Sequence, residues 1–486
     1  MGQAFDKDSF TPDDHIDFRK RLQTQLSELK PLLNTPEFSD DSVSLGAELE
    51  LYILDSHGLP APKNMQLLDI MSHPLLNEEL NKFNLEFNLS PVGAKGVPFS
   101  AMTNEISPFL RDLKKQAQEL DSSIASIGIL PTLKAEHLQR QFMTDLPRYR
   151  ALTNELSALK GEPFLVDING IDSLNMHCDE VTLEGANTSF QVHLKVPANN
   201  FANLYNATQL TTPLVLALAG NSPTFLGNKL WHETRIALFK QSIDNRIHDL
   251  TQWRQPARVS FGHGWVREGA WELFAQNVAL YCPILPFVSP EDKPFAELNL
   301  HHGTVWSWNR AVLEPPKPSR SGHLRIEYRT LPAGPTIIDM MANAAFAVGL
   351  TQALADKMDE MLPKITFSHA EYNFYRAAQS GLDANILWPL ANQHTLKEQS
   401  ICEVITQLLP SAADGLAQVG VDSSEINTLM NVIENRLANK QTGAAWQLAC
   451  FDKHLRKSSK DEALAKMLQD YMHLSDAEQA VSTWVI

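Results

Sequence analysis

Cysteine is scarce in this 486-residue sequence, and the four cysteines lie far apart, at positions 178, 282, 402 and 450. No two of them form the closely spaced pair that is typical of a zinc knuckle or a thioredoxin-type site. Four cysteines in a chain of this length also make no disulfide framework. We therefore expect buried free thiols in a reducing compartment, and the cytoplasm as the location.

Positive charge and long apolar segments are scarce too. Only 41 Lys and Arg residues stand against 57 Asp and Glu, which gives a formal net charge of −16. Such an acidic chain is poorly suited to nucleic acid or to an anionic membrane surface. The acidic N-terminus lacks the apolar core of a signal peptide, and no apolar run approaches the ~18 residues that would span a membrane. A phosphorylated substrate would need metal ions or a local arginine cluster.

Several familiar motifs are missing as well. The sequence has no GxxxxGK[ST], no complete GxGxxG after an expected strand, no HExxH and no GxSxG. These absences argue against a P-loop, a Rossmann site, a zinc protease helix and a nucleophile elbow. If the protein binds ATP, it does so with metals and a sheet rather than with a glycine-rich loop.

What is present is a globular composition, with 43% apolar and 20% charged residues. The length allows about two to four domains. We expect a helical arm over 1–40, a catalytic α+β domain over 41–345 and a helical region over 346–486. The periodicities predict strands at 43–55, 82–90, 188–196 and 323–330, helices at 12–34, 64–80, 101–127, 200–220 and 266–280, an irregular Pro-rich stretch at 283–320, and only helices from about 336 to 475.

The first expected strand carries two carboxylates on one face. Successive side chains on a strand point to opposite sides, so Glu48 and Glu50 share a face while Leu49, Leu51 and Ile53 share the other. Two rises of about 3.4 Å place the carboxylates about 7 Å apart along the strand. That spacing suits two neighbouring divalent ions, each taking one carboxylate.

The other three strands alternate in the same way. A solvated face explains any one of them. Together, however, they carry residue types that coordinate hard cations or bind phosphate. We therefore predict a site for two or three Mg²⁺ ions with arginines beside it, from the polar faces Asn84, Glu86, Asn88 and Ser90; Ser189, Gln191, His193 and Lys195; and His323, Arg325, Glu327 and Arg329.

These strands resemble the glutamate–cysteine ligase family, more specifically its carboxylate–amine ligase branch. The resemblance covers about residues 40–350 and rests on GAELELYILD, LEFNLSP, TSFQVHLKV, GNSPTFLG, HHGTVWSWNR and HLRIEYRTLPAGPT. The family shares its catalytic fold with glutamine synthetase. The resemblance thus implies a curved antiparallel sheet with outer helices, forming a funnel-shaped active site that ATP and the amino acids enter from opposite ends.

The resemblance also implies roles for individual residues. Glu48, His193 and Glu327 would hold one Mg²⁺, and Glu50 and Glu86 another, with Mn²⁺ as an alternative ion. Arg329 and Arg235 would be catalytic. The predicted substrate-binding residues are Asn221, Ser222, Arg246, Arg325 and Gln191.

The sequence therefore predicts an ATP-dependent ligase that joins the γ-carboxylate of glutamate to an amine through an acyl phosphate. Cysteine is the acceptor that the resemblance implies, which would place the enzyme in glutathione biosynthesis. Two alternatives stay open: a non-catalytic relative that binds a small molecule, and a phosphotransferase on the same fold. The expected partners are ATP, glutamate and the amine, without nucleic acid or membrane, and a homo-oligomer is left open.

Overall fold

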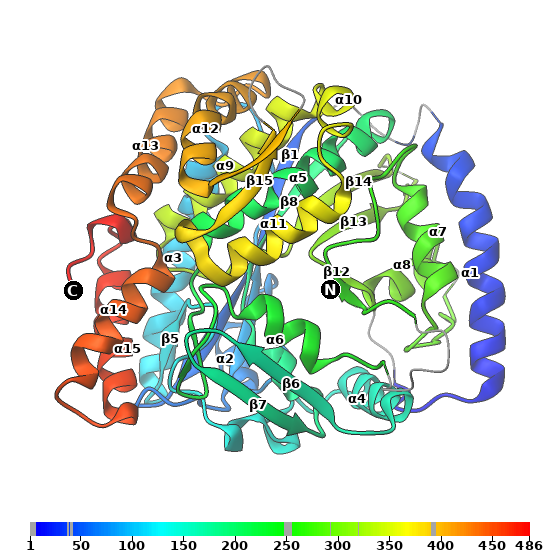
Figure 1. The fold of residues 1–486 in the computed structure, drawn as a ribbon. Helices are drawn as coiled ribbons and strands as arrows, with labels where there is room; N and C mark the ends of the chain where they lie inside the picture. Colours follow the sequence, from blue (N-terminus) through cyan, green and yellow to red (C-terminus); the bar gives the residue numbers. More distant parts are fainter. Residues whose placement is uncertain are drawn as a thin grey trace.

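A curved antiparallel sheet runs through the middle of the protein in the computed structural model, which describes residues 6–35, 38, 42–246, 255–291, 293–318, 320–389 and 395–486 (Figure 1). Short strands β4 (Val92–Gly93) and β5 (Ser123–Ala125) pair with the central β1. This architecture confirms the predicted α+β fold with a curved antiparallel sheet. The strand order is β13 (Asn309–Glu314), β14 (His323–Tyr328), β8 (Phe190–Val196), β1 (Ser44–Leu54), β3 (Asn84–Asn88) and β2 (Leu76–Glu78).

The register of the sheet brings the predicted polar faces together. Glu50 lies opposite Glu86 across β1 and β3. Glu48 lies opposite Gln191 across β1 and β8, and the pair of His193 on β8 and Glu327 on β14 continues the same face. Because directly opposed residues in an antiparallel pair point to the same side, the polar faces of four strands form one surface.

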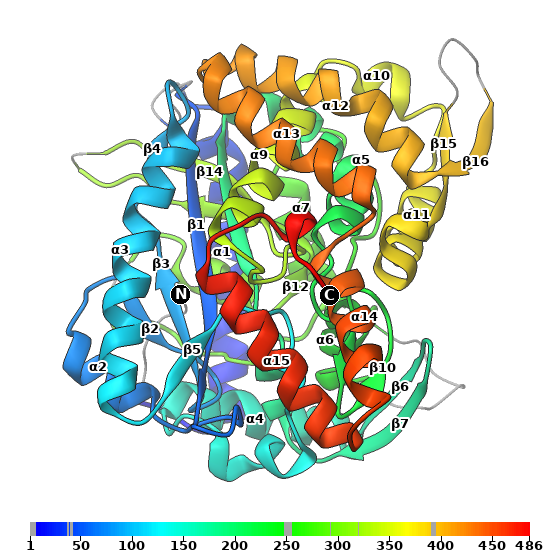
Figure 2. The ribbon, with the colours of Figure 1, turned by 90° about the vertical axis from the view of Figure 1, so that its left-hand side faces the viewer.

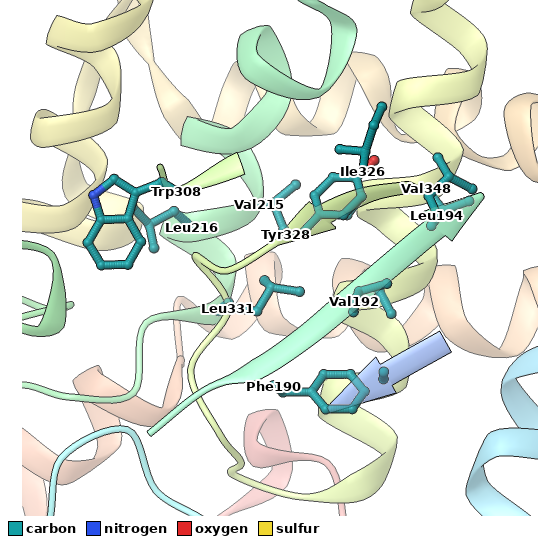
Figure 3. Packing of buried hydrophobic residues seen from close by; sticks show 14 of the residues in the cluster. Phe190, Val192, Leu194, Val215, Leu216, Trp308, Ile326, Tyr328, Leu331 and Val348 are labelled. Carbon is teal, nitrogen blue, oxygen red and sulfur yellow. The ribbon is translucent and has the colours of Figure 1, made fainter. Parts of the chain in front are cut away.

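The other face of the sheet is apolar and packs on α5 (Phe201–Ala219) and α9 (Ile337–Ala355). Burying each such side chain contributes roughly 1.5–3 kcal/mol, so turning a strand over would be very costly. This packing is what fixes the polar face toward the opposite side. Figure 3 shows the contact through Phe190, Val192, Leu194, Val215, Leu216, Ile326, Tyr328, Leu331 and Val348.

The helix α9 is long and apolar enough to cross a membrane by length and composition alone, although Asp339, Asn343, Thr351 and Gln352 interrupt its apolar residues. It is, however, mostly buried within the protein, where α5, α12 (Ile401–Gln418) and α13 (Ser423–Asn439) pack around it. Gly349 on α9 and Gly415 on α12 allow the two backbones to touch, since a Cβ at either position would collide with main-chain atoms of the facing helix. A buried core helix of this kind has the same composition as a membrane span.

The remaining helices cover the ends and edges of the sheet (Figure 1, Figure 2). The helix α1 begins at a capping box, in which Thr11 and Asp14 exchange hydrogen bonds, and it packs on α7 (Trp271–Leu280) and α8 (Ala296–Gly303). The helices are α1 (Pro12–Leu33), α2 (Asn64–Met71), α3 (Pro98–Glu119), α4 (Pro147–Lys160), α6 (Arg235–Ser242), α7 (Trp271–Leu280), α8 (Ala296–Gly303), α10 (Met358–Met361), α11 (Phe367–Ser380), α14 (Gly443–Leu455) and α15 (Lys460–Asp476).

Small two-stranded ribbons complete the chain. β6 (Phe164–Asn169) and β7 (Ser173–Cys178) form a hairpin, as do β9 (Thr224–Phe225) with β10 (Asn228–Lys229) and β15 (Asn385–Pro389) with β16 (Leu396–Ser400). β11 (Val259–Ser260) and β12 (Trp306–Ser307) are parallel. The hairpin β15–β16 lies in the part that was predicted to be helical throughout.

Three further element predictions were wrong in extent. The helix expected over 64–80 ends at Met71, because Ser72 turns left-handed and Pro74 follows, and the chain then forms β2. The helix expected over 101–127 ends at Glu119, where the chain joins the sheet as β5. The stretch 283–320 is not irregular throughout, since it holds α8 and β13. The predicted boundary between the catalytic domain and the helical C-terminal region, at 345/346, falls within α9. The three predicted domain ranges stay a prediction.

Candidate active site

The two carboxylates of β1 are held differently. Glu50 accepts hydrogen bonds from the backbone N–H of Ser189 at 2.7 Å and from Gln191 Nε2 at 2.8 Å. Glu48 instead lies beside the His193 ring, with Nε2 3.2 Å from its Oε1. Because the two side chains share one face of β1 but have different neighbours, they take part in two adjacent groups of candidate ligands.

The first group consists of Glu48, His193 and Glu327, whose ligand atoms lie within 4.8 Å of one another. His193 Nε2 is 3.8 Å from Glu327 Oε1. The ring is buried, and neither of its nitrogens makes a hydrogen bond to any residue that the structure describes. A buried imidazole facing two carboxylates without a hydrogen bond is suited to coordinating a cation.

The second group consists of Glu50, Glu79 and Glu86, also within 4.8 Å of one another. Burial, together with Glu48 and Glu50, raises the pKa of Glu86 to about 7. Burial and the neighbouring carboxylates also raise the pKa of Glu79 well above its usual range. Glu184, on a short 3₁₀ turn over residues 181–186, has a pKa raised to about 7 by burial and by Glu50. In all three residues, burial and neighbouring carboxylates disfavour the charged form of the carboxyl group, and a bound cation would offset this effect.

Two arginines stand between the carboxylates. Arg329, just after β14, donates to Gln191 Oε1 at 2.7 Å and lies 3.4 Å from Glu327. Arg310, on β13, binds Glu327 with two N–H groups at 2.6 and 3.0 Å. Burial alone would raise the pKa of Glu327, but Arg310 and Arg329 hold it below its usual range. In the same way His193 outweighs burial and lowers the pKa of Glu48 to about 2.

The residues present fit divalent cations. Carboxylate oxygens are the preferred ligands of Mg²⁺, and the carboxylates on this face outnumber the arginines that reach them. The Nε2 atom of His193, which faces Glu48 and Glu327 and makes no hydrogen bond to the described residues, offers a further ligand. Glu327 already accepts two hydrogen bonds from Arg310, but a carboxylate offers about four acceptor positions and can still bind an ion.

Most of the predicted site residues therefore converge. The sheet brings together Glu48, Glu50, Glu86, His193, Gln191, Glu327 and Arg329. Arg325 lies on the same face, opposite Lys195 and one pair further out than Glu327. Its position places positive charge at the margin of the acidic group.

Asn221 and Ser222 are placed differently, because both are fully buried and bonded to other protein groups. Ser222 Oγ donates to Glu233 at 2.6 Å, and the backbone N–H of Asn221 donates to the same carboxylate at 2.9 Å. The Asn221 amide also bonds Tyr471 and Gln447, each at 2.8 Å. The bonds of Asn221 thus hold α14 and α15 against the loop after α5. Substrate binding by Asn221 and Ser222 stays a prediction.

The other two predicted arginines also have protein partners. Arg235 is buried and contacts Glu233 at 3.3 Å, and it donates to the carbonyl groups of Thr330 and Arg329 at 3.2 Å. Through the second of these bonds, Arg235 fixes the position of the Arg329 backbone. Arg246 binds Asp244 through two N–H groups at 2.6 and 2.8 Å and adjoins the segment 247–254, which lies outside the described residues.

Three residues of the site were missed from the sequence: Glu79, Glu184 and Arg310. Glu79 was assigned to a helix that ends eight residues earlier, at Met71. Arg310 could have been found, because Asn309, Ala311 and Leu313 alternate with it as buried positions, although the prolines around it suggested an irregular stretch. Glu184 lies on an isolated turn and carries no periodic signal.

Comparisons with known proteins agree with this architecture. A sequence profile of glutamate–cysteine ligase family 2 matches residues 44–422. The structure is similar to that of glutamate–cysteine ligase from Francisella tularensis in complex with AMP, with a TM-score of 0.55 and 13% identity over 92% of this chain and 96% of that chain. It is also similar to a bifunctional glutathione synthetase from Pasteurella multocida, with a TM-score of 0.49 and 12% identity over 95% of this chain and 55% of that chain. No curated protein sequence gives a significant match.

The fold and the family together define an ATP-dependent ligase. The profile covers well over half of the chain, and the chain belongs to glutamate–cysteine ligase family 2. The resemblance seen in the sequence is thereby confirmed.

Proposed function

We propose that this protein is an ADP-forming ligase that joins the γ-carboxylate of glutamate to an amine, with cysteine as the acceptor. The γ-carboxylate attacks the terminal phosphorus of ATP, and the bond from that phosphorus to ADP breaks. The amine then attacks the acyl carbon of the resulting acyl phosphate and loses a proton, and phosphate leaves with the bonding electrons. The products are an amide, ADP and phosphate.

One observation carries this proposal: an excess of buried carboxylates surrounds Arg329 on the polar face of the sheet, beside a histidine that makes no hydrogen bond to the described residues. A site that only binds a neutral small molecule has no use for so much uncompensated charge. A site that brings triphosphate and carboxylate together needs divalent cations, because the two reactants repel each other. Buried carboxylates can hold such cations.

Divalent ions would be held by Glu48, His193 and Glu327 and by Glu50, Glu79 and Glu86. When bound, Mg²⁺ or Mn²⁺ supplies positive charge that offsets the repulsion between the phosphates and the carboxylate. The carboxylates of the chain keep that charge on one wall of the site.

Arg329 is proposed to contact the transferred phosphoryl group. Its Nη1 is fixed by Gln191, which in turn bonds Glu50, while its Nε has no hydrogen-bond partner among the described residues. An arginine that is oriented yet has an unused donor can stabilise charge that develops during transfer. Arg310 has a positioning role, because its two bonds to Glu327 keep that carboxylate in place beside His193.

The test is ADP release from the purified protein with ATP and Mg²⁺, first with glutamate and cysteine and then across other amines and carboxylates. We expect release only with a carboxylate and an amine together. With hydroxylamine in place of the amine, a ligase gives a glutamyl hydroxamate, whereas a phosphotransferase leaves a stable phosphorylated product. No ADP with any pair, from a folded and Mg²⁺-responsive protein, would favour the non-catalytic alternative.

A place in glutathione biosynthesis and a cytoplasmic location follow from the same proposal.

A further inference from the structure

A second cluster of metal-ligating groups lies between α14 and α15, helices that are side by side in Figure 2. Cys450 and His454 are four residues apart on α14, so their side chains share one face of the helix. Asp470 approaches them from α15. Its Oδ2 is 2.7 Å from His454 Nε2 and 3.7 Å from Cys450 Sγ, and the three ligand atoms lie within 4.8 Å of one another.

We propose that Cys450, His454 and Asp470 bind one zinc-class divalent cation that clamps α14 to α15. Thiolate, imidazole and carboxylate are the three ligand types that Zn²⁺ takes in proteins, whereas Mg²⁺ takes oxygen. Cys450 is buried, His454 is partly buried and Asp470 is about half exposed. The cluster therefore opens toward solvent on the Asp470 side, where water completes a tetrahedral shell.

The separations are close to those that such an ion requires. With Zn–S near 2.3 Å and Zn–O near 2.1 Å, a tetrahedral ion sets its sulfur and oxygen ligands about 3.6 Å apart. The observed sulfur-to-oxygen separation of 3.7 Å matches this value. The His454–Asp470 pair has to open by about 0.7 Å, which the half-exposed Asp470 side chain can provide by a small rotation.

Two other roles for the cluster fit less well. A cysteine nucleophile has to be reached by its substrate, but the Cys450 side chain is buried between the two helices. A plain hydrogen bond between His454 and Asp470 is complete without a cysteine and gives no reason for a thiol at the fourth position before the histidine. The simple hydrogen-bonded pair is the alternative that the experiment has to exclude.

A cation between α14 and α15 would stabilise the two helices that hold the loop after α5 in place. Gln447 precedes Cys450 by one turn of α14 and bonds Asn221, and Tyr471 follows Asp470 directly and bonds the same side chain. Both contacts anchor the loop after α5, which leads to Arg235 at the start of α6. These helices lie beyond residue 422, where the family match ends. We therefore expect the clamp to stabilise this C-terminal part without taking part in the reaction.

Titration with Co²⁺ in excess Mg²⁺ tests the proposal, because Co²⁺ bound to a thiolate absorbs strongly in the near ultraviolet. The carboxylate groups on the sheet contain no cysteine, so the band reports on a thiolate elsewhere, and its loss in Cys450→Ser assigns it to this cluster. We expect one equivalent of Co²⁺ to give the band, Zn²⁺ to remove it by displacement, and Zn²⁺ to raise the unfolding temperature.

The variants Cys450→Ser, His454→Gln and Asp470→Asn should each lower affinity for Co²⁺ by more than the about 10–100-fold that loss of an outer-shell partner costs. Cys402→Ser is the matched control, because this thiol bonds the Leu382 carbonyl and lies outside the cluster. If Cys450→Ser does not fold, the half-exposed Asp470→Asn decides. Absence of the band in the wild-type protein, or unchanged Zn²⁺ affinity in Asp470→Asn, would overturn the proposal.

Discussion

The polar face of the sheet and the loop after α5 are both rich in buried charge, but they differ in how far other groups of the chain pair with their carboxylates. On the sheet and the adjacent turn, carboxylates outnumber the arginines, and Glu86 and Glu184 have pKa values raised to about 7. The ring of His193 makes no hydrogen bond to any residue that the structure describes. In the loop, Glu233 accepts hydrogen bonds from Asn221, Ser222 and Arg235.

The difference separates a site that needs ligands from a network that holds the fold. A buried charge without its partner is costly, and a fold keeps one only where a ligand or reaction uses it. A buried charge whose partners all come from the chain is complete. By this criterion we propose the polar face of the sheet as the reaction centre and the loop network as its support.

The largest expected effect comes from Arg329→Ala. If Arg329 contacts the transferred phosphoryl group, its loss should slow ATP-dependent turnover by about 10³–10⁵-fold, the range for an arginine finger. In Mg²⁺ the variant should remain folded, since Glu327 keeps its bonds to Arg310. Steady-state ADP release and circular dichroism check the two parts. Near-normal turnover would remove Arg329 from the reaction.

Arg235→Ala should act mainly on stability. It leaves Glu233 buried without its cation, and breaking a buried pair on one side costs about 3–5 kcal/mol of unfolding free energy. Urea unfolding measures the loss. Arg246→Ala is the control, because Arg246 pairs with Asp244 in a partly exposed position where such pairs contribute about 0–1 kcal/mol. A stable Arg235→Ala protein with lost turnover would restore the catalytic role predicted from the sequence.

Divalent cations should stabilise the protein at the sheet, by about 2.7 kcal/mol at a concentration of 100 Kd. The effect should grow with pH. Folding raises the pKa values of Glu86 and Glu184 from 4.5 to about 7. The two protonated carboxyls therefore add to the free energy of unfolding of the metal-free protein at low pH, and this contribution is lost as the pH rises through about 7. Thermal unfolding with and without Mg²⁺ at pH 6 and pH 8 measures this.

Glu86→Gln should reduce the Mg²⁺ response at pH 8, and it should raise the stability of the metal-free protein. Glu314→Gln is the matched control, since Glu314 lies at the end of β13 and pairs with Lys317. An equal Mg²⁺ response in both variants would place the ions elsewhere.

The smallest expected effect is that of Tyr471→Phe. The variant loses one hydrogen bond to the Ser126 carbonyl and one from Asn221, but Asn221 keeps its bond to Ala333. We expect a loss of about 1 kcal/mol in unfolding free energy and unchanged turnover of the folded protein. A turnover defect at full stability would show that the loop network takes part in the reaction.

The sheet could be predicted from the sequence because its signal is local. Complete alternation over Phe83–Ser90 and the alternation of Glu48–Leu51 fix which side chains share a face. The burial of the apolar partners then fixes where that face points. The resemblance implied how Glu48, Glu50, Glu86, His193 and Glu327 divide between two ions, but it did not include Glu79.

The rest could not be predicted because its partners are distant or aperiodic. Asn221 bonds Tyr471 across 250 positions, and nothing near Asn221 in the sequence records that contact. A polar residue on a loop can equally bind a substrate or another part of the chain. Glu184 is an isolated acid on a turn, and only the fold shows that it lies beside Glu50.

The central claim is that the polar face of the sheet activates a carboxylate with ATP. Oxygen-isotope transfer tests this most directly: glutamate labelled with ¹⁸O in its γ-carboxylate is incubated with ATP, Mg²⁺, cysteine and the protein, and the released phosphate is analysed by mass spectrometry. The account predicts one ¹⁸O atom in each phosphate formed, at a rate that falls in Arg329→Ala as turnover does. Unlabelled phosphate, or labelling at an unchanged rate in Arg329→Ala, would contradict it.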